Sequence, residues 1–325
     1  MQLGLPGCAN RPSHPPQFED FRRAFALGVE TPEGVTRLLA VFEQGALTQA
    51  ELSAILGSSD PVELVGAATQ ARVQDPLGLK LALRATALDP SRPIVWAALS
   101  YKTITLVGNG AGDRRQNLGL LSNALRRWES LEPSNSVPRY LEARYSLFLT
   151  NVPGAVESVA MANRMTQFDT YEEPIRTCVE KVFRARGYPR YSALLLASGH
   201  SSGSLHLTMA GKELLRAAPV TPVTPADLSI LGRRVASGKT MLAELLGLSL
   251  QLQAMDRGAS KPLEKERSVL VQRKTYIQQM AKFLTSPAVS GVSEERWVQF
   301  YEASSNKGEM SATEDLAREE GHPLN

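Results

Sequence analysis

The fold of this chain is decided by residues 83–99, which read LRATALDPSRPIVWAAL. The pair Asp89 and Pro90 ends a first helix, because proline disfavours the helical conformation at the residue before it and donates no backbone hydrogen bond. A second helix follows and carries the large aromatic side chain of Trp96 near its start. The stretch therefore predicts two helices joined by a turn at which the chain reverses its direction.

Four residues of this stretch have the relative spacing of the signature alanine, proline, aromatic and leucine positions of a tetratricopeptide repeat (TPR). They are Ala85, Pro90, Trp96 and Leu99. The stretch thus resembles the junction between two such repeats. The resemblance implies stacked helix pairs whose first helices line a concave surface suited to a protein or peptide partner. It also implies that Trp96 is a buried anchor between the two helices.

The same pattern returns twice further along the chain. Glu132 and Pro133, followed by Tyr140, repeat it at a spacing of 43 residues, whereas the family's usual period is about 34 residues. Residues 167–171 give a weaker third copy without the proline. The similarity covers about residues 60–190 and keeps only part of the signature, so the repeats are predicted to be degenerate.

The composition favours helices. Aromatic residues make up 6% of the chain and hydrophobic residues 43%, which is typical of helices packed through small and unbranched side chains. The formal charge of +3 comes from interleaved acidic and basic residues, so we predict no nucleic-acid partner. No apolar run reaches the roughly 18 residues that a membrane-spanning helix needs, so no transmembrane segment is predicted.

No cofactor or metal site is predicted. Cys8 and Cys178 lie far apart and lack CxxC spacing, and the histidines are scattered, so neither a disulfide framework nor a zinc site is indicated. Cys178 stands in an apolar helical stretch, where we expect a small core residue. Glu172 and Glu173 stand at a predicted helix start, where the helix dipole and solvation explain them.

We predict an all-α fold: an α-solenoid of TPR-like helix pairs followed by a long C-terminal helical hairpin. Capping signals, such as Thr48 with Glu51, mark the helix starts. The predicted segments are a flexible N-terminal tail at 1–17, short N-terminal helices at 18–60, TPR-like repeats at 61–190, a helical extension at 191–218, a proline-rich linker at 219–225, a helical hairpin with a short helix at 226–303, and a polar acidic tail at 304–325.

The segment from Gly232 to Thr240 resembles a phosphate-binding loop at first sight. It has five residues between its glycines, where the Walker motif has four. Leucines before and after it continue one helical stripe across the segment. We therefore predict a single long helix that ends at Arg257, with an antiparallel partner at about residues 262–284.

A catalytic alternative rests on residues 199–203, which read GHSSG and match the G-x-S-x-G nucleophile elbow of α/β-hydrolases. Ser201 would be the nucleophile, and the elbow would need a parallel sheet and a downstream acid and histidine. Only His206 and His322 follow Ser201, and no alternating βα pattern surrounds it. We predict instead a polar turn between two helices, and serine hydrolase is the alternative function.

The N-terminal sequence has two interpretations. Residues 1–8, MQLGLPGC, resemble the end of a bacterial lipoprotein signal whose Cys8 would be lipidated, but the charged and apolar regions that precede such a cysteine are missing from the sequence. The chain as written is expected in the cytoplasm. The alternative is a lipoprotein of the bacterial cell envelope, with the polar residues 9–17 as its tether.

These patterns together predict a non-enzymatic protein–protein interaction or scaffold module that needs no cofactor. Tyr101 and Tyr145 stand five residues after Trp96 and Tyr140, and the layout of the repeat family would turn both towards the concave groove. The alternative is that both tyrosines pack between neighbouring repeats. The partner is expected to be a protein or a peptide, whose identity these patterns do not specify.

Overall fold

The computed structural model describes residues 15–27, 31–199, 202–217, 225–257 and 264–322. Within these ranges the chain is all-α, as predicted, with one short 3-10 helix and no β-strand. The first helices are α1 (Phe18–Ala26), α2 (Pro32–Gly45), α3 (Gln49–Ile55), α4 (Pro61–Gln70), α5 (Pro76–Leu88), α6 (Pro93–Gly108), α7 (Arg114–Leu131), α8 (Val137–Phe148) and α9 (Val152–Arg164). The later ones are α10 (Glu172–Ala185), α11 (Arg190–Ser198), α12 (Ser202–Ala217), α13 (Pro225–Ala236), α14 (Met241–Arg257), α15 (Glu264–Leu284), η2 (Pro287–Val289), α16 (Glu294–Lys307) and α17 (Glu309–Glu319).

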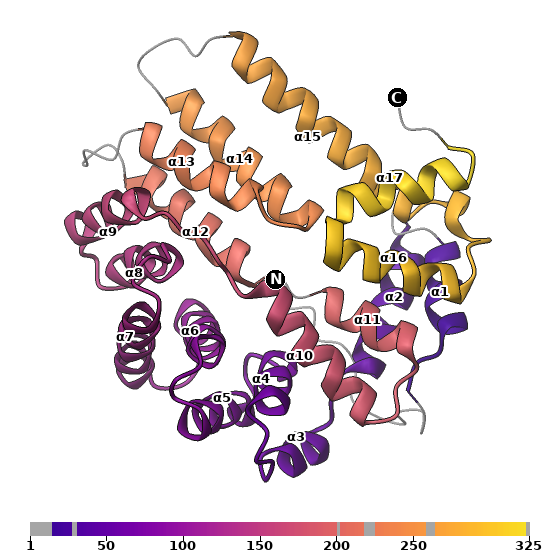
Figure 1. Ribbon diagram of the computed structural model, residues 1–325, viewed down its shortest axis with the longest axis horizontal. Coiled ribbons are helices and arrows are strands. Elements are labelled where there is room, and N and C mark those ends of the chain that lie inside the picture. Colours follow the sequence, from indigo (N-terminus) through magenta and orange to yellow (C-terminus); the bar gives the residue numbers. More distant parts are fainter. Residues whose placement is uncertain (1–14, 28–30, 200–201, 218–224, 258–263, 323–325) are drawn as a thin grey trace.

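Three helical hairpins form the arc on the left and lower side of Figure 1. Helix α4 pairs with α5, α6 with α7 and α8 with α9, while α5 packs on α6 and α7 packs on α8. The sequence marks several of their starts, because Asp60, Asp75 and Asn151 cap helices that have proline in the first turn. We call α4 to α9 the hairpin arc. Its finer description as a TPR-like solenoid stays a prediction.

Helices α10 and α12 cover the inner side of the hairpin arc. Helix α10 packs along α4 and reaches α6, and α12 packs along α8 and reaches α6 and α9. Figure 1 shows α10 and α12 from the side, whereas the helices of the arc are seen nearly end-on. The concave side that the repeat resemblance would give to a partner is therefore occupied by the chain itself.

The turn between α5 and α6 lies within the stretch on which the fold prediction rests. Asp89 is the C-cap of α5, and α6 begins at Pro93. Trp96 is 8% exposed, and its indole Nε1 donates a hydrogen bond of 2.9 Å to the carbonyl oxygen of Pro90. The prediction that Trp96 is buried is confirmed.

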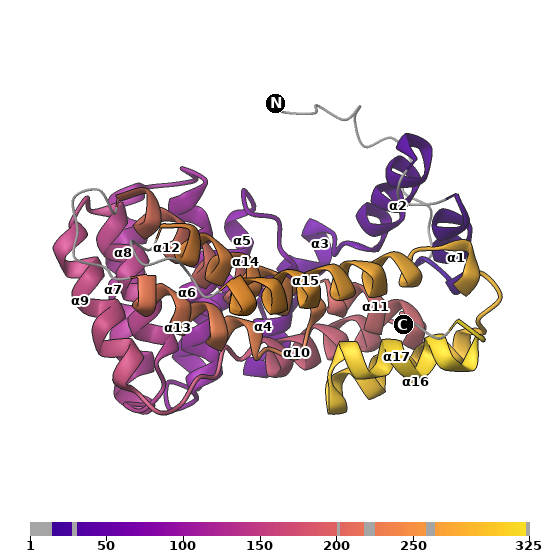
Figure 2. The same cartoon turned by 90° about the horizontal axis from the view of Figure 1, so that it is seen from above.

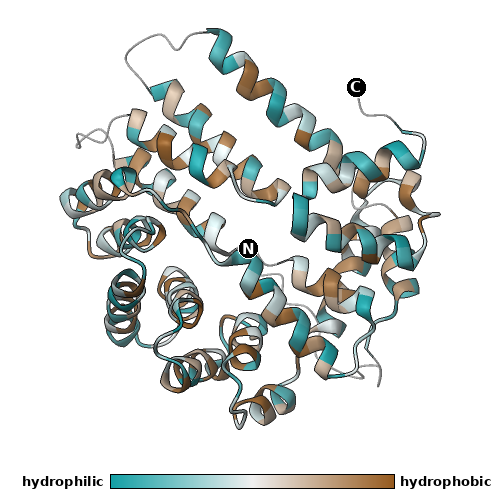
Figure 3. Ribbon diagram, in the orientation of Figure 1, coloured by the Kyte–Doolittle hydropathy of each residue, from teal (hydrophilic) through white to brown (hydrophobic). Residues whose placement is uncertain are grey.

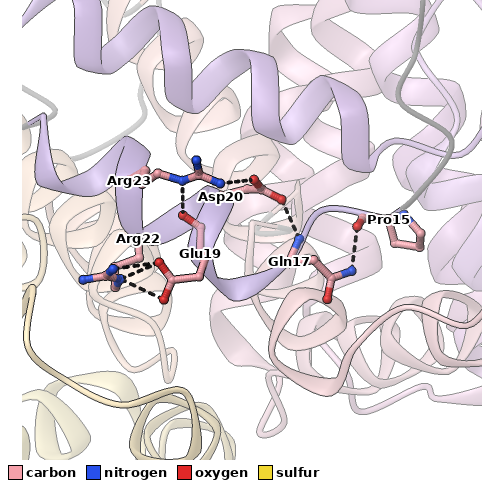
Figure 4. Close-up of polar contacts among 6 residues, drawn as sticks. All are labelled: Pro15, Gln17, Glu19, Asp20, Arg22 and Arg23. Carbon is pink, nitrogen blue, oxygen red and sulfur yellow. Dashed lines mark hydrogen bonds and ion pairs between the residues drawn. The ribbon is translucent and has the colours of Figure 1, made fainter.

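The N-terminal helices α1 and α2 pack together, and Figure 2 shows α2 standing out from the rest of the molecule. The capping signal of Thr48 with Glu51 predicted the start of α3, whereas no such signal marks α1, because α1 has no Ser, Thr or Asp cap. Its start is instead a capping box, in which the Asp20 carboxylate accepts from the backbone N–H of Gln17 at 2.9 Å (Figure 4). Phe21 fixes α1 to the body, since its ring meets those of Phe42 and Tyr191 at centroid distances of 5.7 and 5.9 Å.

The structure corrects the predicted long helix that ends at Arg257. Helix α13 ends at Ala236, residues 237–240 form a turn, and α14 runs back along α13. A turn of four residues is close to one helical turn of 3.6 residues, so the leucine periodicity continues across it and hides the break. The partner helix expected at 262–284 is found as α15, which packs on α14.

The predicted polar tail at 304–325 is wrong over much of its length. Helix α16 extends to Lys307, and α17 follows and packs on α16 and α15. Ala312 and Leu316 are buried on α17 because they lie one helical turn apart and form a narrow apolar stripe. The surrounding charges conceal this stripe in the sequence. Figure 3 shows the same mixture of colours on α17, and a largely hydrophilic α15.

The crossing of α13 and α14 depends on two glycines. A Cβ atom on Gly247 would lie 2.4 Å from the carbonyl oxygen of Gly232 and 2.3 Å from the amide nitrogen of Ala236. Backbone atoms cannot move away without separating the helices, so alanine is excluded at this position despite its higher helix propensity.

We expect Gly247→Ala to destabilise the fold by about 1–3 kcal/mol, the range for overpacked sites. Gly119→Ala is the matched control, because Gly119 lies inside α7 and no atom outside the backbone of its own helix lies within 4 Å of a Cβ placed there. The control should be neutral or up to about 1 kcal/mol more stable. Urea unfolding of both variants measures the difference, and equal effects at the two sites would contradict the close crossing.

Candidate functional site

The structure does not leave Tyr101 in an open groove. Its side chain is 4% exposed, its hydroxyl donates a hydrogen bond of 2.7 Å to the carbonyl oxygen of Thr170, and its ring stacks on that of His206 at 6.0 Å. Burial, with Glu172 and Asp169 nearby, raises the pKa of Tyr101 well above its usual value. Tyr101 is thus a packing residue between α6, α10 and α12, which corrects the expectation that it contacts a partner.

Tyr145 is half-buried on α8 and packs against the hydrophobic core. The structure does not bring it into a polar cluster with Tyr101. The prediction that it binds a partner remains untested.

A buried polar network joins α6, α8 and α12. His206 lies between Arg144, whose Nη1 is 2.6 Å from its Nδ1, and Thr105, whose Oγ1 is 2.9 Å from its Nε2. Because Arg144 can only donate, Nδ1 accepts and the ring proton is on Nε2. Glu213 lies 3.5 Å from the Arg144 guanidinium. Both ring nitrogens of His206 are therefore engaged, and the network holds α12 in the arc, while Nε of Arg144 makes no hydrogen bond.

Burial and the neighbouring Arg144 guanidinium lower the pKa of His206 from 6.5 to about 3. The imidazole is therefore neutral at neutral pH in the folded chain.

The start of α12 is held by Glu172. Its carboxylate accepts from the Ser204 amide at 2.8 Å and from the Ser204 hydroxyl at 2.9 Å. Glu172 is buried, so the expectation that solvation explains this carboxylate is wrong. It stabilises the N-terminus of a helix that lies 30 residues further along the chain.

Lys102 stabilises the C-terminus of α4 with a positive charge, as Glu172 stabilises the N-terminus of α12 with a negative one. The side chain is 9% exposed, and Nζ donates to the carbonyl oxygens of Ala71 at 2.7 Å and Arg72 at 3.3 Å. Gly78 makes room for the ammonium group, since a Cβ there would lie 2.4 Å from Nζ. Burial lowers the pKa of Lys102 to about 8. The lysine therefore fixes the loop between α4 and α5.

That loop forms one wall of an open cleft of about 760 Å³. The other walls are the start of α3 and the loop between α6 and α7, where Gly110 and Gly112 adopt positive φ angles and so allow a tight turn. The cleft is lined by Leu47, Gln49, Leu52, Arg72, Val73, Gln74, Asp75, Pro76, Asn109 and Ala111. We call this the loop cleft, and it is the candidate functional site.

The lining of the loop cleft combines amide side chains with apolar patches. Gln49, Gln74 and Asn109 each carry a hydrogen-bond donor and an acceptor, while Arg72 and Asp75 contribute one charge of each sign. Such a lining fits a peptide, whose backbone presents N–H and C=O groups in turn. It lacks the clustered cations that phosphate backbones require. Sequence reasoning missed it because loops distant in the chain build it.

The nucleophile elbow lacks its scaffold. Ser201 and His200 lie outside the described residues, but α11 ends just before them at Ser198 and α12 begins just after them at Ser202. An elbow requires a strand before the serine, and no strand occurs in the part of the chain that the structure describes.

Cys8 also lies outside the described residues, so the lipidation hypothesis is untested.

Two further expectations concern metals and membranes. Among the described residues, no three His, Cys, Asp or Glu side chains gather as metal ligands would. None of the described helices combines the length and the apolar character that crossing a bilayer requires.

Cys178 is buried, as predicted, and burial raises the pKa of its thiol to about 11.

Comparison with protein families, curated proteins and solved structures gives no match for this chain. The resemblance to tetratricopeptide repeats therefore rests on the residues named above.

The pKa of His206 predicts a loss of stability in mild acid. The unfolded chain takes up a proton below pH 6.5, whereas the folded chain does so only near pH 3, so the free energy of unfolding falls between these values. From pH 7 to pH 5 the free energy of unfolding of the wild type should fall by about 2 kcal/mol more than that of His206→Gln. Urea unfolding of both proteins at each pH measures this difference. An equal pH dependence of the two proteins would contradict the buried neutral imidazole.

A labelling experiment tests whether Ser201 is chemically ordinary. A fluorophosphonate probe, which modifies activated serines, should label the folded chain no faster than the Ser201→Ala variant. Rapid stoichiometric labelling that disappears in Ser201→Ala would revive the hydrolase alternative.

Proposed function

We propose that this chain is a non-enzymatic protein–protein interaction module that binds an extended peptide segment of its partner in the loop cleft. The observation that carries the proposal is the combination of a filled inner face and an open cleft. The inner side of the hairpin arc is occupied by α10 and α12, whereas the loop cleft is open and has about 760 Å³ of free volume.

The chemistry of the cleft supports a peptide over other ligands. Its volume lies within the usual range of about 300–1,000 Å³ for binding sites. Apolar side chains such as Leu47 and Val73 offer places for side chains of the partner, between amides that can pair with its backbone. One wall is fixed by Lys102, which reduces the entropy that would be lost on binding.

The nearby polar groups give no support for catalysis. His206 has both nitrogens engaged, Lys102 donates to two carbonyls, and neither lies in the lining of the loop cleft. A nucleophile paired with a base is not found among the lining residues. A binding role is therefore the function that the geometry supports best.

A displayed peptide library tests the proposal without a known partner. Selection on the immobilised wild-type chain should enrich peptides that bind it. These peptides should bind the double variant Arg72→Glu/Gln74→Ala at least about tenfold more weakly than the wild type, a loss of about 1.4 kcal/mol. Both side chains are exposed, so the variant should unfold within about 0.5 kcal/mol of the wild type.

The matched control is Arg127→Glu, which changes an exposed arginine on α7 outside the cleft. Peptides should bind this control as they bind the wild type. If no peptide is enriched, or if the control loses as much affinity as the double variant, the loop cleft is not the binding site.

A further inference from the structure

A second cavity, of about 210 Å³, lies between the start of α10 and the turn that joins α13 to α14. It shares no lining residue with the loop cleft. The polar side chains on its two walls include Asp169, Glu173, Arg176, Ser237, Lys239 and Thr240. We call it the α10–α14 cavity.

Two atoms in the wall of this cavity lack hydrogen-bond partners. Arg176 is 8% exposed, and its Nε makes no hydrogen bond. The buried Oε2 of Glu173 makes no hydrogen bond either, although it forms an ion pair with Nη2 of Arg176. The two side chains meet at 3.2 Å, but without the geometry of a hydrogen bond. Buried polar atoms in folded proteins are rarely left in this condition. The pair therefore has one donor and one acceptor to offer when a ligand reorients it.

The N-terminus of α10 adds backbone amides as further hydrogen-bond donors. This helix has 14 residues and no side-chain cap, and its N-cap residue Tyr171 has a φ of 56°. The first amides of a helix carry a partial positive charge and favour a carboxylate. In α10 these amides are those of Glu172 and Glu173, because Pro174 has no N–H. Glu172 does not supply one at this helix start, because its carboxylate binds Ser204 at the start of α12.

The remaining charges at the cavity are already partly engaged. Lys239 donates to the carbonyl oxygen of Ser305 at 2.8 Å, and Asp169 accepts from the Tyr171 amide at 2.8 Å. A third carboxylate in the lining, that of Glu172, is bound to Ser204. Arg176 and Lys239 are thus left with Asp169 and Glu173, and the cavity offers both signs of charge. An ion of one sign would leave the other sign unmatched, whereas a molecule that carries both would match both.

We propose that the α10–α14 cavity binds a small zwitterion with an ammonium and a carboxylate group, the chemistry of a free α-amino acid. The carboxylate binds Arg176 and the first amides of α10, and the ammonium group binds Glu173. The volume of about 210 Å³ is below that of sites for drug-sized ligands, which suits a molecule of this size. This inference does not depend on the loop cleft.

Calorimetric titration of the full chain with each of the common L-amino acids tests the proposal. At least one should bind with a Kd of about 1 mM or tighter. Acetate, methylamine and inorganic phosphate are the probes for a single charge, and each should bind at least about tenfold more weakly. The absence of any amino-acid binding, or equally tight binding of acetate or phosphate, would overturn it.

Two substitutions locate the site. Glu173→Gln keeps the shape of a half-buried side chain and should weaken amino-acid binding about tenfold or more, while Arg176→Gln should abolish it. Because Arg176 is buried and its variant can unfold, Glu173→Gln decides the test. Glu180→Gln, further along α10, is the matched control and should bind normally. A folded Glu173→Gln variant with unchanged affinity would overturn the proposal.

Discussion

The fold depends on charged side chains that complete the buried ends of helices belonging to other parts of the chain. A helix end leaves four backbone groups without partners, and a buried end cannot use water for them. Lys102 donates to the carbonyls at the end of α4, and Arg234 donates to the carbonyl of Ala162 at 2.7 Å near the end of α9. Glu172 accepts at the start of α12, and Glu309 accepts from Met241 at 2.8 Å at the start of α14. Cations lie at C-termini and anions at N-termini, as the helix dipole favours.

This capping pattern explains why the inner side of the hairpin arc is closed. Helix α12 is fixed at its start by Glu172 and in its first half by the contact of His206 with Arg144. A partner that displaced α12 would leave the Arg144 guanidinium buried without its acceptor, which is strongly unfavourable. The binding site that we propose is therefore not on the inner side of the arc but at the loops, where Lys102 fixes one wall of the loop cleft.

Some of the interior could be predicted from the sequence and some could not. The burial of Cys178 followed from its apolar helical stretch, and that of Trp96 was implied by the spacing of the repeat resemblance; both are local properties of the sequence. The burial of Tyr101 could not be predicted in this way, because distant segments cover it: Thr170 comes from the segment before α10 and His206 from α12. The signal available for the buried network was Arg144, which shares its helix face with the apolar and aromatic side chains of Tyr140, Leu141, Leu147 and Phe148. The loop cleft and the α10–α14 cavity gave no such signal.

The sequence by itself determined that the chain is all-α and where most helices begin, because caps, prolines and apolar spacing act within a few residues of one another. It also determined the turn at Asp89 and Pro90, which depends only on the geometry of proline. The tertiary structure alone decided that α13 and α14 fold back on each other, that α17 is ordered against α15 and α16, and that α10 and α12 fill the arc. These outcomes depend on close approaches such as that of Gly232 to Gly247 and on pairings between charges far apart in the chain. Neither the close approaches nor the charge pairings leave a periodic pattern or a motif in the sequence, since each arises only when distant segments meet.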